Sequence, residues 1–492
     1  MRRVASGLLP MLAVDRTLAR PLHRQIYEAF RAAILHGRLR PGQRIPSTRV
    51  LAVEVGVSRF PVLNAYAQLL AEGYLESRVG AGTVVSESLP EQLTATAPVD
   101  TKAHAIKSKP RRIASRCARL TRRESLPWTV HMGPFRVGQV AIDEFPLRLW
   151  SNLVARKSRT LKEDAAHYGE TMGNPLLRRA IANYLKISRS VRCEPEQVLI
   201  VNGSQQALEI TARVLLNPGD PVWIEEPSYS LARSVFTLNE CRLVPVPVDA
   251  EGLKVAAGIK KCRTARAAFV TPSHQFPLGV TLSAARRLQL IDWAQKAGAW
   301  ILEDDYDSEY RYESLPIASL QGLDPNSRVI YIGTFSKVLF PSLRLGYLVL
   351  PPDLIDQFFV ARRVMDLGAP TLYQTVLADF IEEGHFARHI RRMRLHYRNL
   401  RRTLFDNLTK VMGDRVEIVG EDAGMHLTIL LRNSESDEEI ARRAVRHKLS
   451  LWPLSRLYIG PRQQGLILGF GGTTEKEIPE AIRKLAELIA GD

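Results

Sequence analysis

The chain has 492 residues, 45% of them hydrophobic, and a formal net charge of +17. Its length predicts more than one domain, and its apolar content is that of a globular protein. No apolar run approaches the length of a membrane span. Its four cysteines are too scattered for a metal or redox motif, so we expect no metal site and unpaired thiols in a reducing, cytoplasmic compartment.

The positive charge is concentrated near the N-terminus. Residues 1–127 hold 21 Lys and Arg against nine Asp and Glu. A basic head on a nearly neutral body predicts a polyanionic partner for the head alone. Because the head also has periodic apolar positions, we expect it to fold.

The first 86 residues carry the pattern of three helices and a hairpin. Leu22, Ile26 and Phe30 recur at helical spacing. Ser47 is placed to cap a second helix, and Ser58 a third. The inner face of the third helix is predicted to comprise Val62, Tyr66, Leu69 and Leu70. Two short strands, 74–78 and 83–85, flank a glycine-containing turn, so residues 1–86 predict a winged helix-turn-helix.

In this geometry the third helix enters the DNA major groove by its N-terminal end. Arg59 would lie there beside Ser58, with Arg49 on the second helix. Gly80 and Gly82 in the wing would let the backbone approach the duplex, and Arg78 would add charge. A three-helix domain that contacts protein is the alternative.

Residues 87–127 lack a helical or alternating period and contain several prolines and arginines. We expect a basic tether here, with a short helix near residues 113–120. From residue 128 to 492, apolar runs alternate with helical patterns, which predicts an α/β domain with a mostly parallel sheet and helices on both faces. The strands are expected near residues 198–201, 222–224, 243–246, 267–270, 300–302, 329–332 and 347–350.

Polar residues follow several of these strands, at the edge where such sheets bind ligands. Ser204 and Gln205 begin a helix after a glycine turn, which favours an anion. Tyr229 follows the next strand and has the shape to stack on a flat ring. Asp304 lies at another strand end. An ionised carboxylate there would keep the nitrogen of a bound pyridine ring protonated, and Tyr306 would contact a hydroxyl group on the same ring.

The strand at residues 329–332 ends in a hydroxyl-rich turn, which Lys337 follows directly. A lysine at the end of a buried strand has a depressible pKa and can attack a carbonyl as an amine. Thr334, Ser336 and Arg344 around it suit a phosphate ester. Together these residues predict a lysine that forms a Schiff base with pyridoxal 5′-phosphate (PLP).

The head resembles the GntR-type DNA-binding domain. The matching motifs are Leu39-Arg40-Pro41-Gly42-Gln43-Arg44-Ile45-Pro46-Ser47-Thr48-Arg49, Gly56-Val57-Ser58-Arg59, Glu72-Gly73-Tyr74-Leu75 and Gly80-Ala81-Gly82-Thr83. The resemblance implies DNA contacts from Arg49, Arg59 and the wing. Phe60-Pro61 departs from it, because the family has a polar pair there that usually ends in threonine.

The body resembles fold-type I aminotransferases in the order of its strand-end motifs and in residues 271–279. Joined to the head, it is similar to the MocR/GabR family of transcriptional regulators. The resemblance implies that Lys337 carries PLP, Asp304 and Tyr306 contact its ring atoms, and Tyr229 stacks on the ring. The implied phosphate ligands are Ser204, Gln205, Thr334, Ser336 and Arg344. It also implies a head-to-tail homodimer with swapped heads, in which Tyr168 is lent by the neighbouring subunit.

Two departures from the enzymes bear on catalysis. Phe276 stands where such enzymes carry an asparagine toward the ring hydroxyl, and Ile467 occupies the place of the arginine that clamps the substrate carboxylate. Transamination is therefore expected to be weak or partial. We favour a regulator that binds a double-stranded DNA operator and senses an amino compound or PLP itself. A working aminotransferase with an accessory head, and a PLP-free DNA-binding dimer, are the alternatives.

Overall fold

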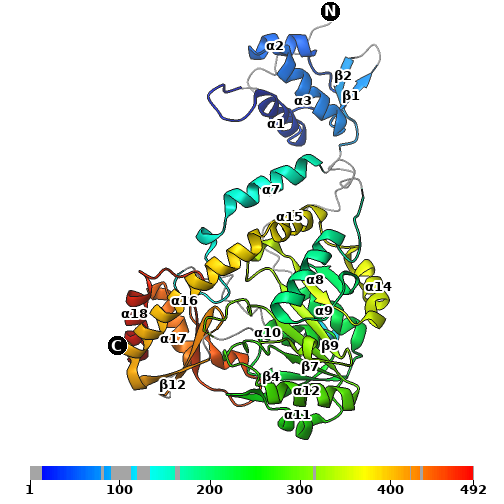
Figure 1. The fold of residues 1–492 in the computed structure, drawn as a ribbon. Helices are drawn as coiled ribbons and strands as arrows, with labels where there is room; N and C mark the ends of the chain where they lie inside the picture. Colours follow the sequence, from blue (N-terminus) through cyan, green and yellow to red (C-terminus); the bar gives the residue numbers. More distant parts are fainter. Residues whose placement is uncertain are drawn as a thin grey trace, which may run out of the picture. The chain divides into compact units, whose positions relative to one another are not determined.

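The computed structural model describes residues 14–78, 82–89, 112–118, 133–160, 167–313, 317–420, 423–432 and 436–490. The chain divides into two compact units, residues 1–111 and residues 112–492. Figure 1 shows both units and labels many of their helices and strands. Among the described residues, no helix combines the length and the apolar character needed to span a membrane.

The described part of the N-terminal unit is a winged helix-turn-helix, as predicted. It comprises α1 (Leu22–Leu35), α2 (Thr48–Val55), α3 (Arg59–Ala71) and the antiparallel hairpin of β1 (Leu75–Arg78) and β2 (Gly82–Val85). Its core is formed by the apolar faces of α1 and α3. Phe30 and Tyr66 meet edge to face, with ring centroids 5.4 Å apart.

Two details of this unit differ from the prediction. Leu70 is 36% exposed, because it lies about 100° around the helix from the fully buried Leu69. Ser58 occupies the N-cap position of α3 without a capping hydrogen bond from its side chain. Ser47 does cap α2, since its Oγ accepts a hydrogen bond of 3.4 Å from the backbone N–H of Val50.

The C-terminal unit is built on an eight-stranded sheet of order β3-β10-β9-β8-β7-β4-β5-β6. Neighbouring strands from β9 to β5 are parallel, whereas β10 runs antiparallel to β3 and β9, and β6 antiparallel to β5. The predicted mostly parallel sheet is thus confirmed. Its strands are β3 (Val198–Val201), β4 (Pro221–Glu226), β5 (Arg242–Asp249), β6 (Gly252–Leu253), β7 (Ala267–Val270), β8 (Trp300–Asp305), β9 (Val329–Thr334) and β10 (Gly346–Val349).

Helices cover both faces of this sheet. Alternate side chains along each strand point to opposite faces, so Ile224 packs toward one set of helices and Trp223 toward the other. The first set is α9 (Ser204–Leu215), α10 (Ser230–Leu238) and α14 (Ile355–Asp366). The second set is α11 (Val255–Cys262), α12 (Ala284–Ala297) and α13 (Leu320–Leu323). Trp223 stacks on Trp293 of α12 at a centroid distance of 3.7 Å.

A smaller antiparallel sheet of order β11-β12-β14-β13 follows in the chain. Its strands are β11 (Val416–Val419), β12 (His426–Leu431), β13 (Trp452–Pro453) and β14 (Gly465–Gly469). It shares the largest apolar core with the remaining long helices. The other helices of the unit are α5 (Ser115–Ala118), α7 (Leu147–Thr160), α8 (Pro175–Arg189), α15 (Thr371–Glu382), α16 (His385–Met412), α17 (Asp437–Ala444) and α18 (Ile478–Ala490).

Candidate functional site

A cavity of about 470 Å³ lies at the carboxyl ends of the parallel strands. Residues of the small sheet and the loop 136–139 complete its wall. The residues predicted from the strand ends come together here, because parallel strands bring their carboxyl ends to one edge. Those lining the cavity are Ser204, Gln205, Tyr229, Asp304, Tyr306, Thr334, Ser336, Lys337 and Arg344.

One end of the cavity is built to hold an anion. α9 begins after Gly203, whose φ of 85° admits the tight turn, and its first N–H groups have no partner within the helix. Arg344 Nη2 donates to the carbonyl of Asn202 at 2.9 Å. The buried Gln205 Nε2 and Ser336 Oγ find no hydrogen-bond partner in the part of the chain that the structure describes. Donors that converge without a partner suit phosphate oxygens.

Asp304, which is buried at the end of β8, offers an acceptor for a cationic donor instead. Its Oδ1 has no hydrogen-bond partner among the described residues. Burial, together with the nearby carboxylates of Asp305 and Asp307, raises the pKa of Asp304 to about 7. A cationic N–H donor beside Oδ1 would favour the ionised carboxylate again. The carboxylate is therefore suited to a protonated ring nitrogen.

Lys337 lies in the same cavity, just beyond β9. Its Nζ donates a hydrogen bond of 3.3 Å to the carbonyl of Gly138. Burial lowers the pKa of Lys337, although the negative charges of Asp307 and Asp304 oppose this effect. A lower pKa increases the fraction of neutral amine, which is the form that attacks a carbonyl group.

Aromatic and imidazole groups surround the remaining wall. Tyr229 meets Phe276 edge to face at 5.9 Å. The hydroxyl of Tyr306 lies 3.1 Å from Nδ1 of His274, which also lies 3.0 Å from a carboxylate oxygen of Asp307. Phe276 thus adds an apolar ring to this wall, to which Tyr306 and His426 contribute polar groups.

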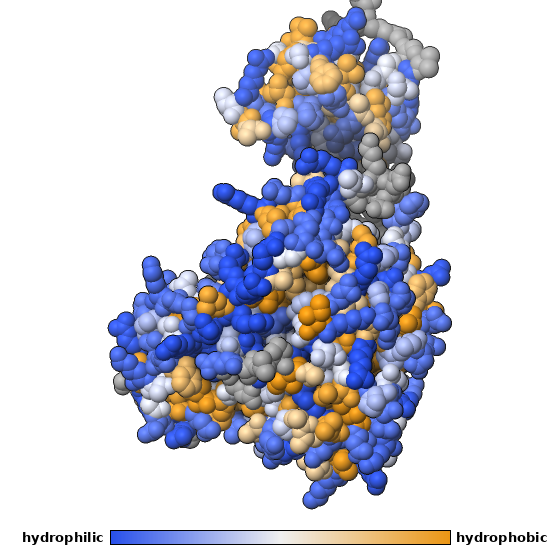
Figure 2. Space-filling model, viewed as in Figure 1, coloured by the Kyte–Doolittle hydropathy of each residue, from blue (hydrophilic) through white to orange (hydrophobic). Residues whose placement is uncertain are grey.

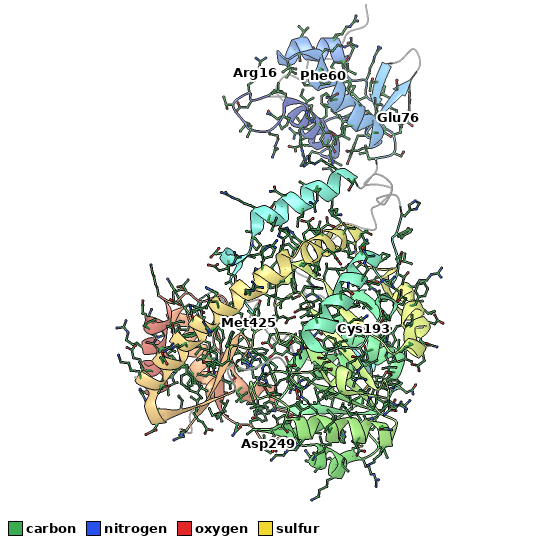
Figure 3. The ribbon with its side chains drawn as sticks, in the orientation of Figure 1. Arg16, Phe60, Glu76, Cys193, Asp249 and Met425 are labelled. Atoms are coloured by element: carbon green, nitrogen blue, oxygen red, sulfur yellow. The ribbon has the colours of Figure 1, made fainter. Side chains whose placement is uncertain are left out.

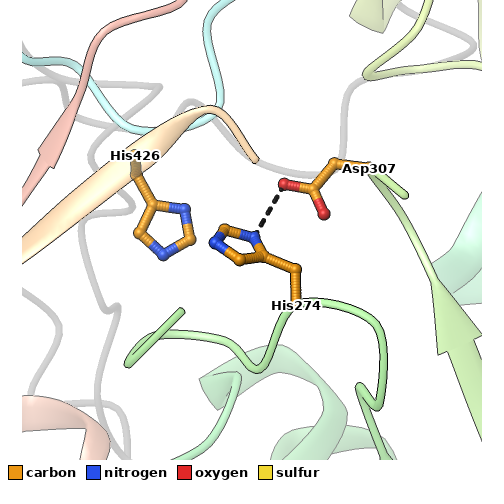
Figure 4. A group of neighbouring side chains, drawn as sticks. All are labelled: His274, Asp307 and His426. Atoms are coloured by element: carbon orange, nitrogen blue, oxygen red, sulfur yellow. Dashed lines mark hydrogen bonds and ion pairs between the residues drawn. The ribbon is translucent and has the colours of Figure 1, made fainter. Parts of the chain in front are cut away.

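Figure 4 shows His274 and Asp307 beside His426, whose importance the sequence did not indicate. Burial lowers the pKa of His426 well below its ordinary value, and the proximity of His274 adds to this effect. Nε2 of His426 lies 3.0 Å from the carbonyl of Pro277. Because Nδ1 of His274 contacts the hydroxyl of Tyr306, we interpret the group as polar support for Tyr306.

Other cavity residues were also missed. Arg136 and Gln139 belong to a loop without periodicity, and Trp452 lies on a two-residue strand. Only after reorientation of its amide does Gln139 accept hydrogen bonds of 3.1 and 3.2 Å from Arg136. No local sequence pattern predicts that these three residues line the cavity, because only the packing of the small sheet and the loop places them beside Lys337.

The C-terminal segment contributes no arginine to the described wall of the cavity. Ile467 is fully buried in an apolar cluster with Trp452 and Leu454. Arg456 and Arg462 both contact Glu438, at 3.0 and 3.8 Å, and are largely solvent-exposed. Neither guanidinium therefore lines the described wall of the cavity.

Tyr168 does not line the cavity of its own chain. Its side chain is 85% exposed, in the segment before α8. Its predicted place in the cavity of a second subunit stays a prediction.

The predicted DNA contacts lie on the surface of the N-terminal unit. Arg49, Ser58 and Arg59 are exposed at the start of α2 and α3, and Arg59 Nε donates to Thr48 Oγ1 at 3.2 Å. Arg78 is ion-paired with Glu76 at 3.5 Å and Glu87 at 2.9 Å, which reduces the charge that it presents.

The wing has a further cation that the sequence analysis did not select. A Cβ on Gly82, which has a φ of 83°, would lie 3.2 Å from the guanidinium of Arg44. The lack of a side chain at Gly82 therefore lets Arg44 pack on the hairpin. Gly80 lies outside the described residues.

Comparison with known proteins agrees with this two-part architecture. Residues 141–485 match the model of the family "Aminotransferase class I and II", and residues 22–85 match "Bacterial regulatory proteins, gntR family". The chain is 42% identical to the probable rhizopine catabolism regulatory protein MocR of Rhizobium meliloti, over 96% of this chain and 95% of that protein. It is 32% identical to the HTH-type transcriptional regulator TauR of Rhodobacter capsulatus, over 95% and 96% of the two chains.

Among solved structures, the body is similar to a kynurenine aminotransferase of Pyrococcus horikoshii. The TM-score is 0.70 and the identity 28%, over 77% of this chain and 95% of that one. It is also similar to the α-aminoadipate aminotransferase LysN of Thermus thermophilus, with a TM-score of 0.67 and 28% identity over 77% and 95%. The latter was crystallised with N-(5′-phosphopyridoxyl)-L-leucine.

A GntR-type DNA-binding head joined to an aminotransferase-like body defines a class of transcriptional regulators. The chain belongs to the MocR-type, GntR-family transcriptional regulators. The predicted cofactor, PLP, is confirmed by the aminotransferase family and its solved relatives. The cavity fits it, because buried donors on Gln205 and Ser336, and the buried Oδ1 of Asp304, all lie in it without a hydrogen-bond partner from the described part of the chain.

Proposed function

We propose that this regulator senses an amino compound, or PLP itself, through the cavity around Lys337. The observation that carries the proposal is a set of buried polar atoms on Asp304, Ser336 and Gln205 that find no hydrogen-bond partner among the described residues and share one cavity with the partly buried Lys337. A folded protein retains unpartnered buried polar atoms at a cost in stability, and where several share one cavity a ligand that completes their contacts accounts for them.

Each residue has a definite part in this proposal. Ser204, Gln205, Thr334, Ser336 and Arg344 hold the phosphate. Asp304 pairs with the ring nitrogen, Tyr306 faces the ring hydroxyl, and Tyr229 stacks on the ring. Lys337 holds the cofactor covalently through Nζ, and its lowered pKa favours that attachment. PLP supplies a reactive aldehyde carbon and an electron-withdrawing ring when it is bound.

The wall formed by Arg136, Gln139 and Trp452 is available for the effector beyond the cofactor. Its composition, one guanidinium, one amide and one indole, supports a small molecule more than a polymer. The missing arginine at Ile467 argues against efficient turnover of a common α-amino acid, so we favour sensing over a working aminotransferase. Titrating candidate amines while the cofactor spectrum and operator binding are recorded together tests this choice. Steady transamination without sequence-selective DNA binding would support the enzyme instead.

For DNA binding we propose a head of residues 1–86, a basic tether of residues 87–127 and an effector domain of residues 128–492. Two heads on a head-to-tail homodimer would read two half-sites. Tyr168 of each chain would then enter the other's cavity. An effector alters operator binding only if it binds one arrangement of the dimer better than the other.

The head's contribution is testable at Arg59. Replacing Arg59 with alanine is expected to weaken operator binding at least about tenfold, because a charged contact at the groove is lost. Arg24→Ala is the matched control, since it removes one exposed arginine from α1. Fluorescence anisotropy with an operator duplex measures both. Equal affinities for the Arg59 variant and the wild type would contradict the assignment.

A further inference from the structure

Phe60 is an exposed aromatic residue in the first turn of α3 (Figure 3). Its side chain is 70% exposed, whereas Val62, Ala65 and Tyr66 of the same helix are buried. The packing of the head therefore does not require the ring. In Figure 2, hydrophobic residues are scattered among hydrophilic ones on the surface of this unit. Because scattered exposed apolar residues are common, only the position of Phe60 indicates a function.

The position is the N-terminal end of the helix that would enter the major groove. Arg59 precedes Phe60 directly, and Arg49 and Arg59 are both exposed at the adjoining helix starts. Arginine and aromatic residues are both enriched at protein interfaces, so the composition of this surface fits a protein partner as well. The position of Phe60 at the start of α3, next to exposed arginines, matches a partner that combines phosphates with small apolar groups.

Double-stranded DNA offers that combination in the major groove. Each thymine presents a C5-methyl group there, and phenylalanine is among the side chains that contact it. Pro61 does not disturb this arrangement, because backbone N–H groups in a first helical turn have no helical partner to lose. One turn along the helix, Leu63 and Asn64 are also exposed on the outer face.

We propose that Phe60 contacts the methyl group of a thymine and thereby specifies thymine at one position of the operator half-site. This inference rests on the proposed DNA binding by the head. The proposal gives a role to Phe60-Pro61, which stands where the family has a polar pair. An apolar contact with the base replaces a hydrogen bond and so changes which base is preferred.

The test uses the full-length protein and a duplex selected from a random pool by the wild type. Each thymine of that duplex is replaced in turn by 2′-deoxyuridine, which keeps the charge and the hydrogen-bonding groups and removes only the methyl. At one position of the half-site we expect about fourfold weaker binding, the effect of burying one methyl group less. Phe60→Ala is expected to abolish this difference.

Val53→Ala serves as the control, because Val53 is an exposed apolar residue on α2, at 82%, away from the first turn of α3. It should retain the full deoxyuridine effect. Because Phe60 is exposed, Phe60→Ala is expected to have the melting temperature of the wild type. A change in DNA binding would then reflect the loss of a contact with DNA rather than unfolding.

Two results would overturn the inference while leaving DNA binding intact. In one, no deoxyuridine position changes the affinity of the wild type. In the other, Phe60→Ala retains the full penalty, or Leu63→Ala removes it instead. If the selection enriches no sequence at all, the proposed DNA-binding function fails, and the inference fails with it.

Discussion

Replacing Lys337 with alanine is expected to abolish the visible absorbance of the bound cofactor and the response to amines. Lys337 is the one lysine among the described residues that line the cavity, and burial lowers its pKa. Without Nζ, PLP retains only the contacts of its phosphate and ring. We expect cofactor occupancy to become dependent on added PLP, measured by absorbance before and after gel filtration.

Borohydride reduction followed by peptide mapping supplies an independent readout. Reduction of the wild type should fix the cofactor on the peptide that contains Lys337. Lys186→Ala is a suitable control, because Lys186 is a surface lysine paired with Glu194 at 2.9 Å. Retained absorbance in Lys337→Ala, or label that maps to another lysine, would refute the assignment of Lys337.

The strand-end residues were predictable because two kinds of information coincide in them. Lys337, Asp304 and Ser204 each lie within five residues of the end of an apolar run, so local sequence places them near strand ends. A parallel sheet then brings these ends to one edge, whatever the sequence separation. Neither step needs knowledge of side-chain packing.

The other parts of the site depend on packing that no local pattern records. His426 reaches His274 only because the small sheet lies against the loop after β7. Arg136 enters the cavity from a loop that has no periodic signal. Leu70 was misplaced because adjacent apolar residues leave the edge of a helical face undefined, and the neighbouring Leu69 alone turns inward.

Arg189 is the second residue whose replacement is expected to have a large effect, and no motif marked it. It is 3% exposed, and its Nε donates to Asp305 at 2.8 Å. Its other nitrogens donate to Ser273 Oγ at 2.6 Å and to the carbonyl of Ile317 at 2.7 Å. Tyr331 also donates to Asp305, at 2.5 Å. The network thus ties α8 to the end of β8, directly beside Asp304.

Arg189→Met is expected to lower the free energy of unfolding by about 3–5 kcal/mol, because it leaves the carboxylate of Asp305 buried without its cation. All six tryptophans lie in residues 112–492, so tryptophan fluorescence during denaturant unfolding reports on the C-terminal unit alone. Arg213→Met, which removes an exposed i,i+4 pair with Glu209, should cost less than about 1 kcal/mol.

The double variant Arg189→Met with Asp305→Leu distinguishes the buried charge from the lost packing. Replacing both partners of a buried pair by apolar groups is far less costly than removing one of them. We therefore expect the double variant to be more stable than Arg189→Met alone. If the two variants unfold at the same denaturant concentration, the stability of the C-terminal unit does not depend on pairing the charge of Asp305 with that of Arg189. The hydrogen bonds from Arg189 to Ser273 and Ile317 would then account for the loss.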